Sequence, residues 1–307
     1  DKTKHINNPK PPSNLTINTE LKDFKGFFTW CHKNKKFMKD IEYPFMKIDY
    51  KKFVEKNPSF TDEDWNSVVM YLRTWRNKKT TSTGKKRKNN FYRLVFAEFI
   101  KILANSGMRV HECLLLTWGD ITLRKRYEII KNTKKKTEKK VERVSAIIQI
   151  HPDTKTGRRK VICAAGTYLK RLKELYQKTE GRMPKNDEFV FRNIGCKNSK
   201  NAHIGGALSD SFMRRMWYEF LDDIKNDKDI EFEERYTLHS MRAYYINKRL
   251  ELGVSPSFVA KLVGHNIRTM EKHYENIQLL NLEPELIKVR RDNLEKVDIQ
   301  TFDIDML

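Results

Sequence analysis

The chain has 307 residues, 38% of them hydrophobic, and its 62 lysines and arginines against 40 aspartates and glutamates give a formal charge of +22. This excess of positive charge favours a polyanionic partner, with nucleic acid ahead of an anionic membrane surface. No run of about 18 apolar residues is present, so we expect a soluble protein of one large or two ordinary domains.

Several common site motifs fail when their spacing is checked. The four cysteines are scattered and lack the spacing of a zinc site or a disulfide framework, which indicates reduced, cytosolic thiols. His111-Glu112 would begin a zinc-protease motif, but residue 115 is leucine instead of histidine. Gly84-Lys85 lacks the earlier glycine of a phosphate-binding loop. We therefore set aside a zinc protease and a nucleotide-binding loop.

Residues 1–19 are polar and contain prolines, which predicts a linker or tail. From Glu20 onward, apolar residues at helical spacing predict a helix that runs into a lysine-rich stretch. The sequence does not begin with methionine, from which we expect a fragment or a processed chain.

Two further helices are predicted before residue 107. Thr61 with Asp64 three residues later forms a capping box at the start of the first. Residues 78–90 are small, polar and basic, and predict an exposed loop. The second helix starts at Phe91 and ends at Ser106-Gly107.

Directly after that glycine, Arg109 is followed three residues later by Glu112. Such a pair is ordinarily a structural ion pair, although a helix break can also present an arginine to a phosphate. Residues 121–161 then alternate like strands around a run of lysines, and residues 154–161 have the turn chemistry of a hairpin. This hairpin carries Lys155, in a Thr-Lys-Thr-Gly setting, and Lys160, and most lysines on such a loop are merely exposed.

Residues 168–220 contribute mainly packing elements. Apolar spacing predicts helices over 168–176 and 212–220, a short buried piece at 189–191 and a glycine-rich loop over 193–206. None of these carries an evident catalytic motif.

The stretch from 236 to 274 gathers polar side chains at spacings suited to a phosphate. Thr237 is the predicted cap of a helix on which His239 and Arg242, three apart, share one edge. Ser255-Pro256 starts a second helix, and Gly264 ends it in front of His265. Tyr274 falls on the apolar side of a further helical segment, where most tyrosines are core residues.

The order of these motifs resembles the catalytic domain of the tyrosine recombinases, the phage integrase family. The resemblance covers about residues 61–277 and rests on Arg109, Lys155, His239-x-x-Arg242, Gly264-His265 and Tyr274. It implies an α+β, mainly α-helical fold with a small antiparallel sheet or hairpin, preceded by a partial helical core-binding segment.

The resemblance also implies a domain organisation. We expect residues 1–57 to hold a linker and the last helix of a core-binding domain, with the catalytic domain over 58–280. Residues 281–307 are expected to form a tail that docks on a neighbouring protomer. The alternative for the first helix is an accessory helix of the single domain present.

Enzymes of this family cut DNA without hydrolysis, and the resemblance assigns roles to matching residues. Tyr274 is the implied nucleophile that forms a 3′-phosphotyrosine, while Arg109 and Arg242 hold the phosphate and stabilise its pentacoordinate state. Two guanidiniums supply the positive charge, so no metal and no cofactor is implied.

The remaining implied roles concern protons and positioning. Lys155 is the general acid for the leaving 5′ oxygen, and His239 accepts or returns the proton of the tyrosine. His265 donates to a nonbridging oxygen, and Glu112 orients Arg109. The candidates for contacts to the DNA backbone are Lys85, Lys86, Arg87, Lys134, Lys135, Lys136, Arg158 and Arg159.

The function implied is that of a site-specific recombinase that acts on double-stranded DNA and exchanges strands through a Holliday junction. Its expected partners are three further protomers on the DNA and accessory DNA-bending proteins; it is expected to be monomeric when free, in the cytoplasm or nucleoid of a prokaryotic host. The alternatives are a type IB topoisomerase-like relaxing enzyme and a noncatalytic DNA-binding relic.

Overall fold

The computed structural model describes residues 14–34, 58–78, 90–132, 137–152, 154, 157–195, 203–268 and 270–271, without the side chains of 15, 128–132 and 137–140. The chain divides into two compact units, residues 1–56 and 57–307. Within the ranges given above, no helix combines the length and the hydropathy that a membrane crossing needs.

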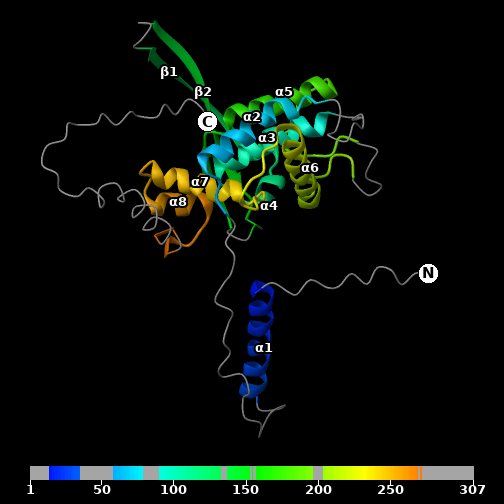
Figure 1. Cartoon of the computed structure of the whole chain (residues 1–307), viewed down its shortest axis with the longest axis vertical. Coiled ribbons are helices and arrows are strands. Elements are labelled where there is room, and N and C mark those ends of the chain that lie inside the picture. The colour runs from blue at the N-terminus through cyan, green and yellow to red at the C-terminus, as the bar shows by residue number, and fades with distance from the viewer. Residues whose placement is uncertain are drawn as a thin grey trace, which may run out of the picture. The chain divides into compact units, whose positions relative to one another are not determined.

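The described residues of the first unit form the helix α1 (Asn14–Asn34), drawn in dark blue in Figure 1. It begins six residues before the predicted start at Glu20. Three aromatic side chains of α1, Phe24, Phe27 and Trp30, are more than half exposed, whereas Cys31 is buried. The assignment of this helix to a core-binding domain stays a prediction.

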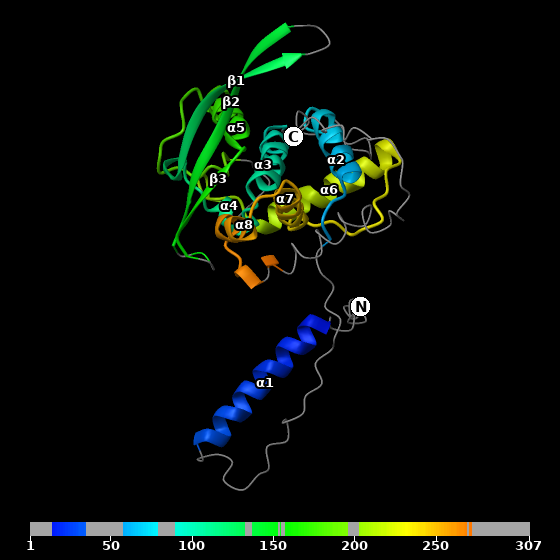
Figure 2. The same cartoon turned by 90° about the vertical axis from the view of Figure 1, so that its left-hand side faces the viewer.

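The second unit is mainly helical, with a small sheet at one side (Figures 1 and 2). Its helices are α2 (Asp62–Trp75), α3 (Phe91–Ser106), α4 (Val110–Leu114), α5 (Gly166–Glu180), α6 (Asp210–Lys228), α7 (Ser240–Glu251) and α8 (Pro256–Val263), with a 3-10 turn at Trp118–Asp120. This arrangement confirms the predicted α+β, mainly α-helical class with an antiparallel sheet.

The sheet has three antiparallel strands in the order β1 (Ile121–Asn132), β2 (Thr137–Ile150), β3 (Arg159–Cys163). Strand β3 pairs only with residues 146–150 of β2. The other edge of this part of β2 pairs with the start of β1. Beyond this point, residues 124–132 and 137–145 pair with each other alone. They form a two-stranded ribbon that extends away from the helices (Figure 2). The strand character predicted within 121–161 is thus confirmed for residues 121–132, 137–150 and 159–161.

Local capping chemistry sets several helix ends where the sequence predicts them. The Thr61 hydroxyl accepts a hydrogen bond from the Asp64 backbone N–H at 3.1 Å, which starts α2. Gly107 and Gly264 adopt the left-handed conformation, with φ of 63° and 68°, and end α3 and α8. Helix α7 begins at Ser240 and not directly after Thr237, because the Ser240 hydroxyl accepts the Thr237 N–H and closes a turn there.

Helix α3 lies at the centre of the unit, where all of its residues except Leu94 are buried. It contacts α7, α5, α2, α6 and β3. Its buried Arg93 pairs with Asp223 of α6 at 2.9 Å, and Trp75 donates to the same carboxylate at 2.7 Å. A second, smaller core joins α7 to α8 and Met270. Because α3, α7 and α8 are fixed to one another, the residues at their ends hold a defined geometry.

Candidate active site

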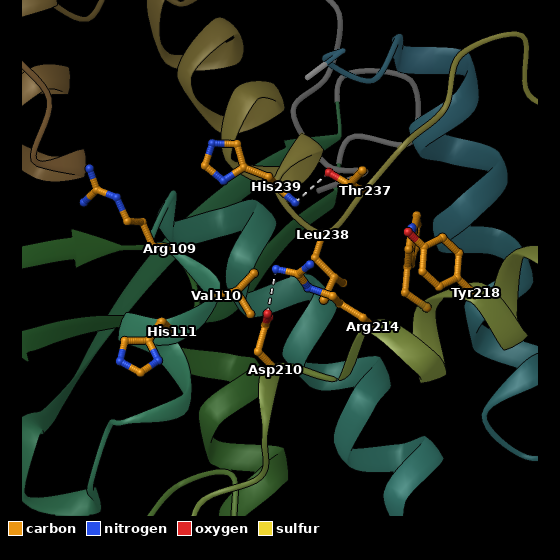
Figure 3. Close-up of a pocket in the computed structure, with 10 residues that line it drawn as sticks. Arg109, Val110, His111, Asp210, Arg214, Tyr218, Thr237, Leu238 and His239 are labelled. Atoms are coloured by element: carbon orange, nitrogen blue, oxygen red, sulfur yellow. Dashed lines mark hydrogen bonds and ion pairs between the residues drawn. The ribbon is translucent and has the colours of Figure 1, made fainter. Parts of the chain in front are cut away.

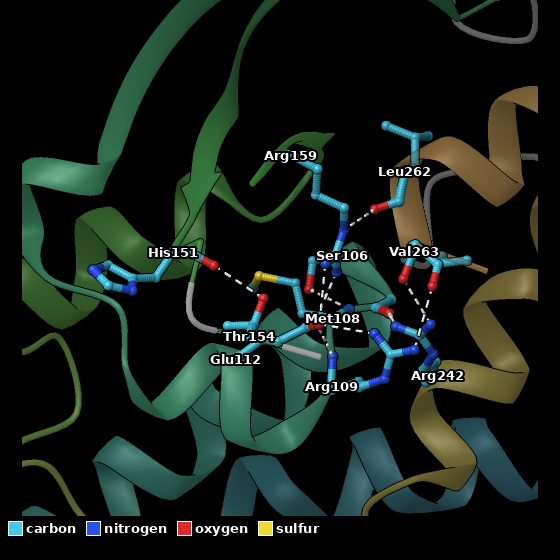
Figure 4. A network of polar contacts seen from close by, with 12 residues as sticks. Ser106, Met108, Arg109, Glu112, His151, Thr154, Arg159, Arg242, Leu262 and Val263 are labelled. Atoms are coloured by element: carbon cyan, nitrogen blue, oxygen red, sulfur yellow. Dashed lines mark hydrogen bonds and ion pairs between the residues drawn. The ribbon is translucent and has the colours of Figure 1, made fainter. Parts of the chain in front are cut away.

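Four chain segments meet at one place: the turn after α3, the start of α7, the end of α8 and the start of β3 (Figure 4). Left-handed glycines end α3 and α8, so each helix stops sharply and its last carbonyl groups stay available to other donors. The side chains that reach these carbonyls are arginines from the other segments.

Arg242 is the most enclosed of these arginines, with 1% of its surface exposed. Its Nη1 donates to the Gly107 carbonyl and its Nη2 to the Val263 carbonyl, each at 2.6 Å. Burial lowers the pKa of Arg242 to about 9, and the positive charge of nearby Arg109 adds to this shift. Both of these acceptors are uncharged, so an anion at this place would gain a strong electrostatic attraction.

Arg109 occupies the N-cap position of the short helix α4 in an extended conformation. Its backbone N–H and its Nη1 donate to the Glu112 carboxylate at 2.9 and 2.8 Å, and its Nη2 donates to the Gly264 carbonyl at 3.3 Å. The side chain stays 23% exposed. The predicted pairing of Glu112 with Arg109 is therefore present in the structure.

The Glu112 carboxylate has a second arginine partner that the sequence does not indicate. Arg159, at the start of β3, donates through Nη1 and Nη2 to the two oxygens of Glu112 at 3.0 and 2.6 Å. Burial would raise the pKa of Glu112, but the hydrogen bonds from Arg159 and Arg109 lower it to about 2. Glu112 is thus a carboxylate held between two guanidiniums.

Arg159 was expected to contact the DNA backbone, and the structure gives it internal partners. Its side chain is 9% exposed, and besides Glu112 its Nε donates to the Leu262 carbonyl at 3.0 Å. Its sequence neighbour Arg158 is exposed, as is Lys160, the competitor for the lysine role. The two adjacent arginines therefore have different environments, which the basic sequence Gly-Arg-Arg-Lys does not reveal.

A pocket of about 440 Å³ opens beside Arg109 (Figure 3). It is lined by Arg109, Val110, His111, Asp210, Arg214, Trp217, Tyr218, Thr237, Leu238 and His239. His239 is exposed as a residue, yet its imidazole lies in this concave surface. Desolvation there, together with the charges of Arg242 and Arg109, lowers the pKa of His239 from 6.5. A neutral imidazole suits a proton acceptor.

Sequence reasoning missed the wall of the pocket opposite His239. Arg214 and Asp210 of α6 form an ion pair at 2.7 Å, one helical turn apart. This spacing could have been noticed in the sequence, whereas the approach of α6 to the start of α7 is a tertiary property.

His265 directly follows the left-handed Gly264, and its backbone N–H donates to the Ala260 carbonyl at 3.0 Å. The histidine thus lies on the sharp turn that the sequence predicts. The structure brings four predicted residues into this region besides His265: Arg109, Glu112, His239 and Arg242.

Several predicted site residues lie outside the part of the chain that the structure describes. They are Lys155, Tyr274, Lys85, Lys86, Arg87, Lys134, Lys135 and Lys136. Their roles stay predictions. In the described ranges, no group of histidine, cysteine, aspartate or glutamate side chains is arranged to hold a metal ion.

Comparisons with known proteins give a consistent result. The model of the phage integrase family matches residues 76–279, well over half of the chain. No significant match was found among curated protein sequences.

Among solved structures, the chain is similar to the Tn1549 transposon integrase in complex with transposon right end DNA, with a TM-score of 0.58, 18% identity, and coverage of 90% of this chain and 81% of that chain. It is also similar to the XerH site-specific recombinase bound to a palindromic difH substrate, with a TM-score of 0.56, 18% identity, and coverage of 90% and 66%. At these identities the likenesses show a shared fold.

Proposed function

The chain belongs to the phage integrase family of tyrosine recombinases, and on this premise we propose how it performs site-specific DNA recombination. Tyr274 attacks a phosphodiester of double-stranded DNA, so that a bond forms between its hydroxyl oxygen and phosphorus while the bond to the 5′ oxygen breaks. The tyrosine proton passes to His239, and Lys155 gives a proton to the leaving 5′ oxygen. Attack by a 5′ hydroxyl of the partner duplex reverses these steps and exchanges the strands through a Holliday junction.

The observation that supports this proposal most is the convergence of Arg109 and Arg242 at the end of α8. These two guanidiniums come from distant parts of the sequence, and Arg242 is buried with carbonyl groups as its acceptors. A phosphate that passes through a pentacoordinate state gains negative charge on its nonbridging oxygens, which preorganised guanidiniums stabilise. His265, on the adjoining turn, is positioned to add a further donor.

The decisive experiment is a suicide substrate, a cognate duplex with a nick that lets the cleaved fragment diffuse away. We expect a covalent protein–DNA adduct with the wild-type chain and none with Tyr274→Phe, which should still bind the duplex. Tyr244→Phe is the matched control, because Tyr244 is a buried tyrosine whose hydroxyl donates to Asp62 at 3.2 Å. Absence of any adduct with the wild-type chain would leave the noncatalytic DNA-binding alternative. EDTA should not reduce adduct formation.

A supercoil-relaxation assay next to a two-site exchange assay separates recombination from topoisomerase activity. We expect recombinant products from two-site substrates, and at most slow relaxation of a plasmid without a site. Efficient relaxation without exchange would favour the type IB topoisomerase alternative, which uses the same covalent chemistry.

The proposal extends to assembly and place of action. Four protomers act on two duplexes, with a tail over 281–307 that docks on a neighbouring protomer and with accessory DNA-bending proteins, in the cytoplasm or nucleoid of a prokaryotic host. Sedimentation of the chain with and without its DNA site tests the tetramer. Unchanged assembly and recombination after truncation behind Asn281 would remove the role of the tail.

A further inference from the structure

The end of α8 offers three consecutive carbonyl groups, and each accepts a hydrogen bond from a different arginine. Arg159 donates to Leu262 at 3.0 Å, Arg242 to Val263 at 2.6 Å and Arg109 to Gly264 at 3.3 Å. The last carbonyls of a helix lack partners within the helix and carry the negative end of its dipole. The three guanidiniums therefore form one cluster that is organised by the end of this helix.

Arg159 differs from the other two arginines in what its guanidinium faces. Arg109 lines the pocket, and Arg242 bonds only backbone carbonyls through its two terminal nitrogens. In Arg159, both terminal nitrogens donate to the Glu112 carboxylate in a bidentate pair, and Nε donates to the Leu262 carbonyl. These contacts use three of the five N–H groups of the guanidinium, and only 9% of the side chain is exposed, so little of it is accessible to a phosphate.

Arg159 also joins segments that carry the other site residues. It is the first residue of β3, directly behind the connection of residues 151–158 that carries Lys155. Through Glu112 it reaches the backbone and side chain of Arg109, and through Leu262 it reaches the turn that presents His265. One side chain thus joins the start of β3 to Arg109, through Glu112, and to the end of α8, through Leu262 (Figure 4).

We propose that Arg159 is a positioning residue for DNA cleavage, which holds Glu112 against Arg109 and fixes the end of α8 to the strand behind the lysine hairpin. It does not contact DNA. This inference rests on the proposed function, because it concerns the rate of the same cleavage step. Glu112 faces Arg109, Arg159 and, at longer range, Arg242, so loss of Arg159 removes two hydrogen bonds to a buried carboxylate and lets Arg109 move. Misplacement of a catalytic group by about 1 Å costs about 100-fold in rate.

The test is single-turnover cleavage of the suicide substrate at saturating DNA by Arg159→Met. We expect the cleavage rate to fall about 10- to 100-fold, with the dissociation constant for DNA and its salt dependence unchanged. In the background of Glu112→Gln, the same substitution should cause almost no further loss, because both changes break one network. Arg159→Lys keeps the positive charge but lacks the planar guanidinium that binds both carboxylate oxygens, and should cleave at an intermediate rate. This variant also serves as the test if Arg159→Met does not fold.

Arg192→Met is the matched control. Arg192 is 3% exposed, and its Nη2 donates to both carboxylate oxygens of Glu180, the last residue of α5, at 2.8 and 2.7 Å. Its loss should lower the melting temperature without changing the cleavage rate of the folded protein.

Two outcomes would overturn the inference. The first is cleavage by Arg159→Met at the wild-type rate. The second is weaker DNA binding with a smaller salt dependence and a normal cleavage rate at saturating DNA, which would make Arg159 a DNA contact. If the wild-type chain forms no adduct, the proposed function fails. Amide hydrogen exchange then still tests whether Arg159 fixes the end of α8. We expect faster exchange at residues 262–265 in Arg159→Met, and unchanged protection there would overturn the inference by itself.

Discussion

Replacing Glu112 with glutamine removes one negative charge that two arginines share. The Glu112 side chain is 2% exposed, and in the part of the chain that the structure describes it accepts two hydrogen bonds from Arg109 and two from Arg159, at 2.6 to 3.0 Å. Glutamine keeps one oxygen acceptor and places an NH₂ group against guanidinium N–H groups, so donors face donors. The two positive charges would also remain without the anion between them.

The size of the loss follows from the pKa of this carboxyl. Its ordinary value is 4.5 and its value in the folded protein is about 2, and this difference corresponds to about 3 kcal/mol of folding free energy at pH 7. Removing one partner of a buried ion pair independently predicts about 3–5 kcal/mol. Because the folded pKa is the lower one, the stabilisation is complete above the ordinary pKa and is lost as pH falls towards 2. At pH 3, about 1.4 kcal/mol should remain.

Urea unfolding of wild type and Glu112→Gln, followed by tryptophan fluorescence at pH 7 and pH 3, measures this difference. At pH 7 we expect the midpoint to fall by about 1 M or more, given a slope of about 1–3 kcal/mol per molar urea. Glu142→Gln is the control, since Glu142 is 33% exposed and its lysine partners lie at 3.8 and 3.7 Å; it should cost less than about 1 kcal/mol. A loss below about 1 kcal/mol for Glu112→Gln, or one that does not depend on pH, would refute the reasoning.

Three further predictions concern the surrounding residues. Arg242→Lys cannot reach both of its carbonyl acceptors, and we expect single-turnover cleavage to slow about 100- to 1,000-fold with DNA affinity changed less. Gly107→Ala would place a Cβ 2.3 Å from a ring carbon of Tyr245 at a φ of 63° and should destabilise the protein by about 2–5 kcal/mol in denaturant unfolding, whereas Gly181→Ala, with a φ of 72° and open space, should cost about 1 kcal/mol. In the DNA-free protein, NMR should show His239 titrating below 6.5 because of desolvation and nearby arginines, with the midpoint raised in Arg242→Met; a midpoint at or above 6.5 would contradict this account.

Local sequence signals were sufficient where the local chain decides the structure. Gly107 and Gly264 end their helices because glycine adopts a positive φ without strain, and Thr61 starts α2 because its hydroxyl accepts an N–H of the first turn. These same features place the turns that carry Arg109 and His265. The order of the motifs then indicated the family, and the match over residues 76–279 confirms that the chain belongs to it.

The sequence could not indicate contacts between segments that fold together from a distance. Nothing near Arg159 in the sequence distinguishes it from Arg158, yet one guanidinium is paired inside the protein and the other side chain is exposed. Phe258 precedes the buried Val259 in the apolar sequence of α8, but 62% of Phe258 is exposed, because α7 and Met270 cover only part of the helix surface. Burial depends on the neighbour as much as on the pattern.

The ribbon of residues 124–132 and 137–145 has a different consequence, for how this chain can vary. Its backbone hydrogen bonds stay within the ribbon, since β3 reaches only residues 146–150 of β2. Removal of two residues from each of its strands would preserve the alternation of side chains and leave the register of the remaining sheet unchanged. The ribbon is therefore a module whose length can drift during evolution, or be altered by an engineer, while the arginines behind it keep their positions.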